Sequence, residues 1–306
     1  MMVIGYSKKL HFVFACIFSA AAAVNAAYVQ EDFRGTTAPG WVIESNSAGS
    51  PGLTAETGED PDGDGWLRLT NDQDASQGAF AYYDTAIPTN QGLVFTFDFV
   101  TWGSGGTLAD GLALAIFRAD VDPDPQSYGG SLAYAPHHTT PGLNGAVAGF
   151  GFDEFGNFSN PDDGNKTGGP GRTQNAVAIR GSQGEDRLTG YEYQTGTGPD
   201  PLPDFSTDEV SSRDDAVIHT VKITIPTDKV ISVEWKPEGE DWSYLIRDYE
   251  CGLNCPDQIK FGYAASTGSL KAYHEVRNLS VTAVPEPASI SIMALGGLTL
   301  LRKRRK

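Results

Sequence analysis

The 306-residue chain carries 22 Lys and Arg against 39 Asp and Glu, which gives a formal net charge of −17 at pH 7. This length suffices for one large domain or two small ones. An acidic surface argues against nucleic acid or an anionic membrane as the partner, because both repel negative charge. It favours solubility and attracts calcium weakly, but it identifies no site by itself.

The first 26 residues are typical of a secretory signal peptide. Lys8 and Lys9 precede an apolar run over residues 10–24, and Val24-Asn25-Ala26 supplies a small-residue cleavage site. A membrane anchor is the alternative, although the run is shorter than the ~20 residues that a transmembrane helix needs. We therefore expect export, cleavage after Ala26, and a mature body over residues 27–283.

An acidic segment, Asp60-Pro61-Asp62-Gly63-Asp64-Gly65, begins like the calcium loop of an EF-hand. The twelfth position of such a loop holds a bidentate Glu, whereas this chain has Asn71 there. A solvated acidic turn is therefore the favoured interpretation. A second calcium site is the alternative.

The body is dominated by short strand-like segments. Residues 93–99 alternate three phenylalanines with Val, Thr and Asp, as expected for a strand with one buried face. Further strands are expected at residues 111–117, 146–152, 217–225, 230–235, 259–264 and 275–282. Short strands separated by Gly- and Pro-rich turns predict an all-β fold, a single antiparallel β-sandwich of jelly-roll type. Helices are expected only in the N-terminal signal segment and in a short hydrophobic C-terminal segment.

The sequence alone indicates no metal-binding or catalytic role for the histidines. His137 and His138 form a pair in an apparent loop, and no metal or catalytic partner is visible beside them, which favours a surface pair. His219 and His274 fall in predicted strands and are expected to be satisfied side chains there.

The segment with the most specific chemistry has the pattern D-x-[aromatic]-x-N-x4-D. Asp153, Phe155, Asn157 and Asp162 occupy its named positions. Calcium takes oxygen ligands from carboxylates, amides and backbone carbonyls, and this loop supplies all three. The alternative is that these side chains only cap turns, as Asn and Asp often do.

Two cysteines remain after removal of Cys16 with the signal peptide. Cys251 and Cys255 have the spacing C-x3-C. In an exported protein this spacing favours a local disulfide that closes a loop between two strands. A metal pair is the less favoured alternative, because no second Cys or His pair lies nearby.

The C-terminal segment, residues 284–306, contains Pro285-Glu286-Pro287, an apolar run to Leu301, and a basic cluster at residues 302–306. It resembles the PEP-CTERM sorting signal, whose three parts occur in this order. The resemblance implies a Gram-negative bacterium, processing by an exosortase near the triplet, and a cell-surface or extracellular product. A plain C-terminal membrane anchor is the alternative, and the membrane is a partner through this helix before processing.

Several motifs together resemble the L-type (legume-like, concanavalin A-like) lectins. The matching segments are residues 77–82, Ala109-Asp110-Gly111, Gly129-Gly130-Ser131-Leu132, residues 152–157, residues 261–268, and His274-Glu275-Val276. They follow the order of that family and extend from about residue 30 to residue 283. The resemblance implies a concanavalin A-like sandwich that binds carbohydrate.

The resemblance also assigns roles to individual residues. Asp110 would follow a cis peptide bond and accept hydrogen bonds from two sugar hydroxyls, and the backbone N–H of Gly130 would contact the sugar. Phe155 would stack on the sugar, while Asn157 would ligate calcium and bind the sugar. The expected metal-site residues are Asp153, Phe155, Asn157 and Asp162, and the expected partner is a glycan or exopolysaccharide.

Two positions depart from the family pattern. Its transition-metal site adds a Glu and a His where this chain has Gly151 and Thr167. Such a site needs those ligands, so we expect calcium as the probable ion and no manganese-type site.

Catalytic motifs are not apparent. The paired carboxylates of related sandwich glucanases and the G-x-S-x-G elbow are both missing from the sequence. We therefore expect a calcium-dependent, non-catalytic lectin-like protein rather than an enzyme. The alternative is a structural protein of the cell envelope or extracellular matrix that keeps the fold without binding sugar.

Overall fold

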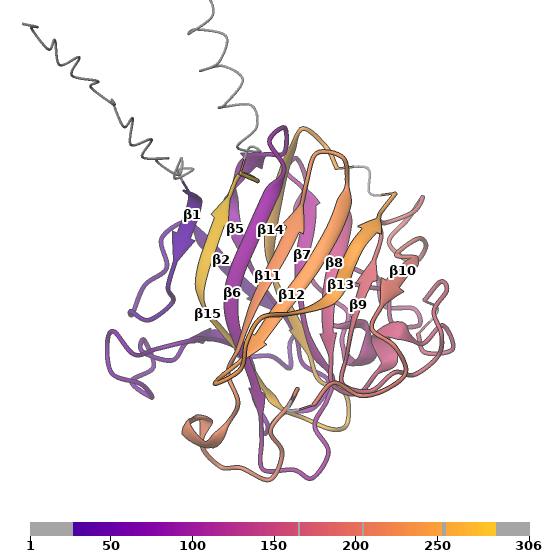
Figure 1. The fold of residues 1–306 in the computed structure, drawn as a ribbon. Coiled ribbons are helices and arrows are strands. Elements are labelled where there is room, and N and C mark those ends of the chain that lie inside the picture. Colours follow the sequence, from indigo (N-terminus) through magenta and orange to yellow (C-terminus); the bar gives the residue numbers. More distant parts are fainter. Residues whose placement is uncertain (1–26, 165, 204, 253–254, 286–306) are drawn as a thin grey trace, which may run out of the picture.

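Two antiparallel β-sheets pack face to face in the computed structural model of the chain (Figure 1). The structure describes residues 27–164, 166–203, 205–252 and 255–285. The expected signal helix, the C-terminal hydrophobic helix and most of the PEP segment therefore lie outside the described residues. The predicted all-β sandwich is confirmed.

The first sheet has eight strands, in the order β13-β12-β11-β6-β15-β4-β3, and β1 also pairs with β15. Its strands are β1 (Ala27–Glu31), β3 (Gly52–Leu53), β4 (Leu67–Thr70), β6 (Leu93–Trp102), β11 (His219–Ile225), β12 (Val230–Pro237), β13 (Ser243–Glu250) and β15 (Tyr273–Thr282). The first and last strands of the body, β1 and β15, are therefore neighbours (Figure 1).

The second sheet has seven strands, in the order β10-β9-β8-β7-β14-β5-β2. Its strands are β2 (Trp41–Ser45), β5 (Gly78–Pro88), β7 (Gly111–Arg118), β8 (Ala146–Asp153), β9 (Ala176–Arg180), β10 (Tyr193–Gly196) and β14 (Gln258–Ser266). Three single 3-10 turns complete the described structure: η1 (Gly129–Ser131), η2 (Asn157–Ser159) and η3 (Arg213–Asp215).

The core lies between the sheets and follows the alternation of the sequence. In β6 the rings of Phe95, Phe97 and Phe99 are fully buried, whereas the intervening Val, Thr and Asp are half-buried on the other face. Phe97 makes an edge contact with Phe152 of the opposite sheet, with ring centroids 6.0 Å apart. Aromatic pairs of this kind add to the stability gained by burying apolar area.

The central strands β7, β8 and β9 of the seven-stranded sheet are buried on both faces, because loops cover the face that points away from the core. Tyr134 and Phe158 from these loops pack against it with fully buried rings. A Cβ at Gly149 would lie 2.7 Å from the Tyr134 ring, and one at Gly151 would lie 2.4 Å from the Phe158 ring. The two glycines of β8 therefore give the covering loops room to approach the sheet.

All seven predicted strands are present, with ends that shift by a few residues. The prediction did not name the other eight strands. Among these, β13 has mostly exposed side chains, and its pairing with β12 contains register shifts. An edge strand of this kind lacks the regular apolar alternation on which the prediction rests.

Candidate functional site

Four loops meet beside the seven-stranded sheet. They carry Asp110 before β7, Gly130 in η1, Asn157 in η2 and Gly268 after β14. A Cβ at Gly130 would lie 2.2 Å from Cβ of Asn157, and one at Gly268 would lie 3.0 Å from Oδ2 of Asp110. The predicted sugar-binding residues Asp110, Gly130 and Asn157 thus come from separate segments into one region.

Asp110 is fixed by its backbone. The Ala109–Asp110 peptide bond is cis, as the lectin resemblance implies. The N–H of Asp110 donates to the carbonyl of Ser266 (3.0 Å), and its own carbonyl accepts from the N–H of Glu154 (3.0 Å). The residue is therefore tied both to β14 and to the loop that follows β8.

The carboxyl group of Asp110 is buried, with 4% of the residue exposed, and its Oδ2 atom has no hydrogen-bond partner. Burial and the nearby charges of Glu154 and Asp163 raise the pKa of Asp110 to about 7, although Lys166 and a hydrogen bond from the backbone N–H of Gly268 oppose this shift. A buried oxygen without a partner is rare in folded proteins and often marks a functional position.

Asp153 organises the loop after β8. Its two carboxylate oxygens accept hydrogen bonds from the backbone N–H groups of Gly156 and Phe158, each at 2.7 Å. The residue is fully buried. Burial raises its pKa well above the usual range, although the two N–H groups oppose the shift.

The two acids of the predicted metal loop differ in exposure. The side chain of Asp162 is exposed, and its backbone N–H donates to Oδ1 of Asn160 (3.1 Å). Its neighbour Asp163 is half-buried, and a Cβ at Gly130 would lie 2.8 Å from Oδ2 of Asp163. The role of Asp162 as a metal ligand stays a prediction, and Asp163 is the acid that lies beside Gly130.

A buried lysine lies among these acids. Lys166 is 4% exposed, and its Nζ lies 2.7 Å from Oδ2 of Asp163. Burial lowers the pKa of Lys166, and the charge of Asp163 opposes this shift. No sequence pattern predicted this role, because lysines are mostly exposed and are rarely buried unless they are paired.

A second buried cation holds the same loop. Arg180 of β9 is fully buried and donates to the carbonyls of Phe158 (2.6 Å), Thr167 (2.9 Å), Gly168 (3.3 Å) and Tyr191 (2.7 Å). Burial lowers its pKa to about 10. The guanidinium thus binds carbonyls of the irregular segments on both sides of β9.

Phe155 lies at the rim with an arginine over its ring. The guanidinium carbon of Arg172 is 3.7 Å from the ring centroid, and Nε of Arg172 donates to the carbonyl of Phe155 (2.8 Å). The ring is half-buried and the arginine is exposed. The cation of Arg172 therefore lies against one face of the Phe155 ring at this rim.

Glu154 points to the opposite side of the loop. Its Oε2 lies 3.2 Å from Nε2 of His274, whose Nδ1 lies 2.5 Å from the hydroxyl of Thr70. Oε1 of Glu154 has no hydrogen-bond partner, and all three residues are buried. The prediction that His274 is a satisfied strand histidine is confirmed.

The charges of this region fit a divalent cation. Three carboxylates (Asp110, Asp153 and Asp163) interact here with the buried Lys166, Asp153 also interacts with Arg180, and the charge of Glu154 acts on Asp110. Buried charges need compensation because the protein interior solvates them poorly. Asn157 and the carboxylate oxygens are the hard ligands that calcium prefers. The residues present therefore suit calcium.

The two departures from the family pattern also have a structural context. Any side chain at Gly151 would collide with the ring of Phe158. Thr167 is exposed, and its carbonyl accepts a hydrogen bond from Arg180. The expectation that no manganese-type site exists at these positions stays a prediction, supported by the lack of room at Gly151.

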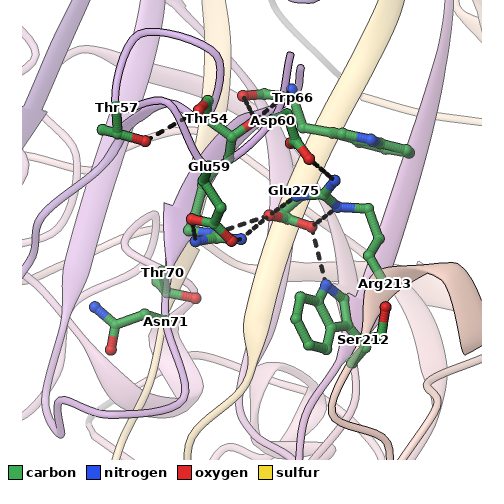
Figure 2. A network of polar contacts seen from close by, with 12 residues as sticks. Thr54, Thr57, Glu59, Asp60, Trp66, Thr70, Asn71, Ser212, Arg213 and Glu275 are labelled. Carbon is green, nitrogen blue, oxygen red and sulfur yellow. Dashed lines mark hydrogen bonds and ion pairs between the residues drawn. The ribbon is translucent and has the colours of Figure 1, made fainter. Parts of the chain in front are cut away.

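The acidic loop around Asp60 is docked onto the eight-stranded sheet (Figure 2). The carboxylate of Asp60 accepts two hydrogen bonds from Nη1 of Arg213 (2.9 and 3.1 Å), and Arg213 also binds the buried Glu275 (2.6 and 2.9 Å). Glu275 further accepts from Arg68 (2.8 Å) and from the indole of Trp102 (2.9 Å). The structure thus gives Asp60 a role in fastening the loop.

Cys251 and Cys255 lie near one end of the core, Cys251 buried and Cys255 half-buried. The predicted disulfide would join these two positions. Burial raises the pKa of the Cys255 thiol. Formation of the bond in the exported protein stays a prediction.

The solved structures with a similar fold include lectins. The Lotus tetragonolobus seed lectin is 14% identical, with a TM-score of 0.59 over 85% of this chain and 100% of that chain. The Bauhinia forficata lectin in complex with GalNAc is 15% identical, with a TM-score of 0.57 over 84% and 98%. The chain has the legume-lectin fold.

The Ca2+/Man-bound VIP36 exoplasmic/lumenal domain also has this fold, at 18% identity and a TM-score of 0.53 over 81% of this chain and 84% of that chain. Residues 283–306 match the PEP-CTERM protein-sorting motif, as predicted from Pro285, Glu286 and Pro287. No curated protein matches the chain by sequence. Within the described residues, no helix is long and apolar enough to cross a membrane.

Proposed function

We propose that the protein is an exported, non-catalytic, calcium-dependent carbohydrate-binding protein. Its partner is a glycan or exopolysaccharide. The observation that carries this proposal is the buried carboxyl group of Asp110, whose Oδ2 atom lacks a partner and lies beside Gly268 and Asp163. A sugar hydroxyl is a suitable partner for such an oxygen.

Asp110 would accept hydrogen bonds from sugar hydroxyls, while the backbone N–H of Gly130 and the side chain of Asn157 would fix the orientation of the sugar. Phe155 and the guanidinium of Arg172 would border the ring. Few polar groups and one aromatic face are typical of a shallow sugar site, and display of many copies on a surface would compensate for weak binding.

Calcium would be held by Asp153, Asn157, the backbone of Phe155 and an acid at position 162 or 163. We favour Asp163 over Asp162, because Asp163 interacts electrostatically with Asp110 and its carboxylate lies beside Gly130 and Asn157. The ion supplies positive charge that balances the buried carboxylates. The chain itself contributes the fixed loop, since Asp153 already binds two of its N–H groups.

Sorting follows from the C-terminal motif. Cleavage of the signal peptide after Ala26 and processing by an exosortase near Pro285 would place the sandwich at the cell surface or outside the cell. The legume-lectin fold of residues 27–283 would then face the surrounding polysaccharide.

The test is a glycan array probed with wild-type protein and with Asp110→Asn, each with calcium and with chelator. We expect binding by the wild type that chelator abolishes, and no binding by the folded variant. If no glycan is bound by folded, calcium-loaded protein, the proposal is wrong.

A structural role is the second candidate, and the Lys166–Asp163 ion pair favours it. Together with Arg180, this lysine orders the loop by groups of the chain itself. On this view the sandwich is kept as a component of the envelope or matrix. Binding of exopolysaccharide that is unchanged in Asp110→Asn would favour it.

A further inference from the structure

A group of potential metal ligands lies beside the proposed sugar site. His137, His138 and Asp163 each offer one ligand atom, and these atoms all lie within 4.8 Å of one another. The histidines belong to the segment between η1 and β8, and the aspartate follows η2. The sequence predicted a surface pair of histidines without a partner, because Asp163 is distant from them along the chain.

Backbone contacts hold the two segments in this arrangement. His137 and Thr140 exchange N–H···O hydrogen bonds of 3.0 and 2.9 Å, which close a tight turn. The N–H of His138 donates to the carbonyl of Gly164 (3.0 Å). A Cβ at Gly164 would lie 3.1 Å from Cα of His137, so only glycine fits there easily. The ligand atoms are thus brought together by the fold itself.

A second observation concerns the ring of His137. Its Nδ1 atom is buried and has no hydrogen-bond partner in the described structure. The ring is packed edge-on against Tyr128, with centroids 4.6 Å apart, and it lies 4.6 Å from the ring of His138. Leaving a buried nitrogen unsatisfied costs about 1–3 kcal/mol, so a partner for the imidazole is expected.

We propose that His137, His138 and Asp163 form a binding site for a zinc-class divalent ion. Two imidazoles and one carboxylate are the donor set that such ions favour, whereas calcium prefers oxygen ligands alone. Three protein ligands leave coordination positions open for water or for an oxygen of a bound molecule. Neither Gly151 nor Thr167 takes part, so this site is separate from the manganese-type site of the family pattern.

Lys166 does not prevent this arrangement. Its Nζ binds Oδ2 of Asp163 at 2.7 Å. A carboxylate has two oxygens and about four acceptor positions, so the ammonium and a metal ion can share it. The ion would tether the turn at His137 to the segment that carries Asp163, next to Gly130.

The test is isothermal titration of the purified protein, without a histidine tag, with zinc chloride in saturating calcium. We expect one zinc ion per chain in the wild type. His138→Ala and Asp163→Asn should each weaken zinc binding by at least about tenfold, since each removes a ligand. Glu185→Gln is the control, because it removes an exposed acid outside the candidate site, and it should leave zinc binding unchanged.

Cobalt(II) provides an independent readout, since its visible absorption reports nitrogen ligation. The cobalt spectrum of the wild type should be lost in His138→Ala, an exposed position whose change leaves the core intact. Absence of zinc binding, or equal binding by wild type and His138→Ala, overturns the proposal. If Asp163→Asn fails to fold, His138→Ala decides alone. Because Asp163 is also a proposed calcium ligand, the comparison that is independent of calcium and sugar binding is wild type against His138→Ala, which keeps every residue of the proposed sugar and calcium sites.

Discussion

Two clusters of buried charge differ in how completely they are paired. In the first, on the eight-stranded sheet, the carboxylate of Glu275 accepts hydrogen bonds from Arg68, Arg213 and Trp102 (Figure 2). In the second, beside the seven-stranded sheet, Oδ2 of Asp110 and Oε1 of Glu154 have no partner. The first cluster is what a purely structural network requires.

The contrast indicates where function resides in this fold. Folding alone gives no reason to leave buried carboxylate oxygens unpaired, because each one costs free energy. The second cluster therefore retains capacity for a ligand, whereas the first has none left. The predictions below compare the two clusters, beginning with the largest expected effect.

Removing the charge of Glu275 should affect stability most. Glu275→Gln leaves Arg68 and Arg213 without their shared counter-charge, and breaking a buried pair in this way costs about 3–5 kcal/mol. The free energy of unfolding in urea measures the loss. Glu240→Gln in an exposed turn is the control and should change stability by less than about 0.5 kcal/mol. A loss below about 1 kcal/mol for Glu275→Gln would mean that the network contributes little.

Calcium should stabilise the protein by binding at the second cluster and not at the first. At about 100 times its Kd, a ligand of the native state adds about 2.7 kcal/mol to the free energy of unfolding. The unfolding midpoint should therefore rise with calcium and fall with chelator, and Asp153→Ala should lose this response. Asp163→Asn should also lose it, whereas Asp162→Asn should keep it. The reverse result would assign the ligand to Asp162, and no calcium response in the wild type would favour the structural role.

The pH dependence of stability should report on Asp110. The pKa of Asp110 is about 7 in the folded protein, whereas an unperturbed Asp has a pKa of 3.8. Between these two pH values the folded state therefore holds a proton that the unfolded state has released. Stability therefore falls as the pH rises from about 4 to 7, by up to about 1.4 kcal/mol per pH unit for one group. Unfolding of wild type and Asp110→Asn in chelator measures the difference. If the free energy of unfolding has the same slope against pH in both proteins, Asp110 does not cause this pH dependence.

The sequence predicts the sandwich well because its strands follow simple rules. The alternating phenylalanines of β6 and the apolar runs of β7 and β8 leave few alternatives to buried strands. The order of the motifs then identified the loops that carry Asp110 and Gly130. Strand order within each sheet is set by long-range pairing, which local patterns do not specify.

The details of the site were less predictable. The spacing of the motif selected Asp162, whereas the structure shows Asp162 exposed and the carboxylate of its neighbour Asp163 beside Gly130. Lys166 and Arg180 belong to residue types that are mostly exposed, so sequence patterns place them on the surface. The approach of His137 to Asp163 depends on the packing of two irregular loops, for which no sequence period exists.

The smallest effect should come from the rim of the site. Arg172→Ala removes an exposed cation–π contact with Phe155 and a hydrogen bond to its carbonyl, so the free energy of unfolding should fall by no more than about 1 kcal/mol. Glycan affinity should fall more noticeably, because Arg172 holds the backbone and the aromatic ring of Phe155 in place. Phe155→Ala should weaken it further, and Arg172→Lys, which keeps the charge without the fork of donors, should give an intermediate result. Glycan affinities from titration of the three variants would rank them. Equal affinities would remove Phe155 from the sugar site and leave Asp110, Gly130 and Asn157 as its core.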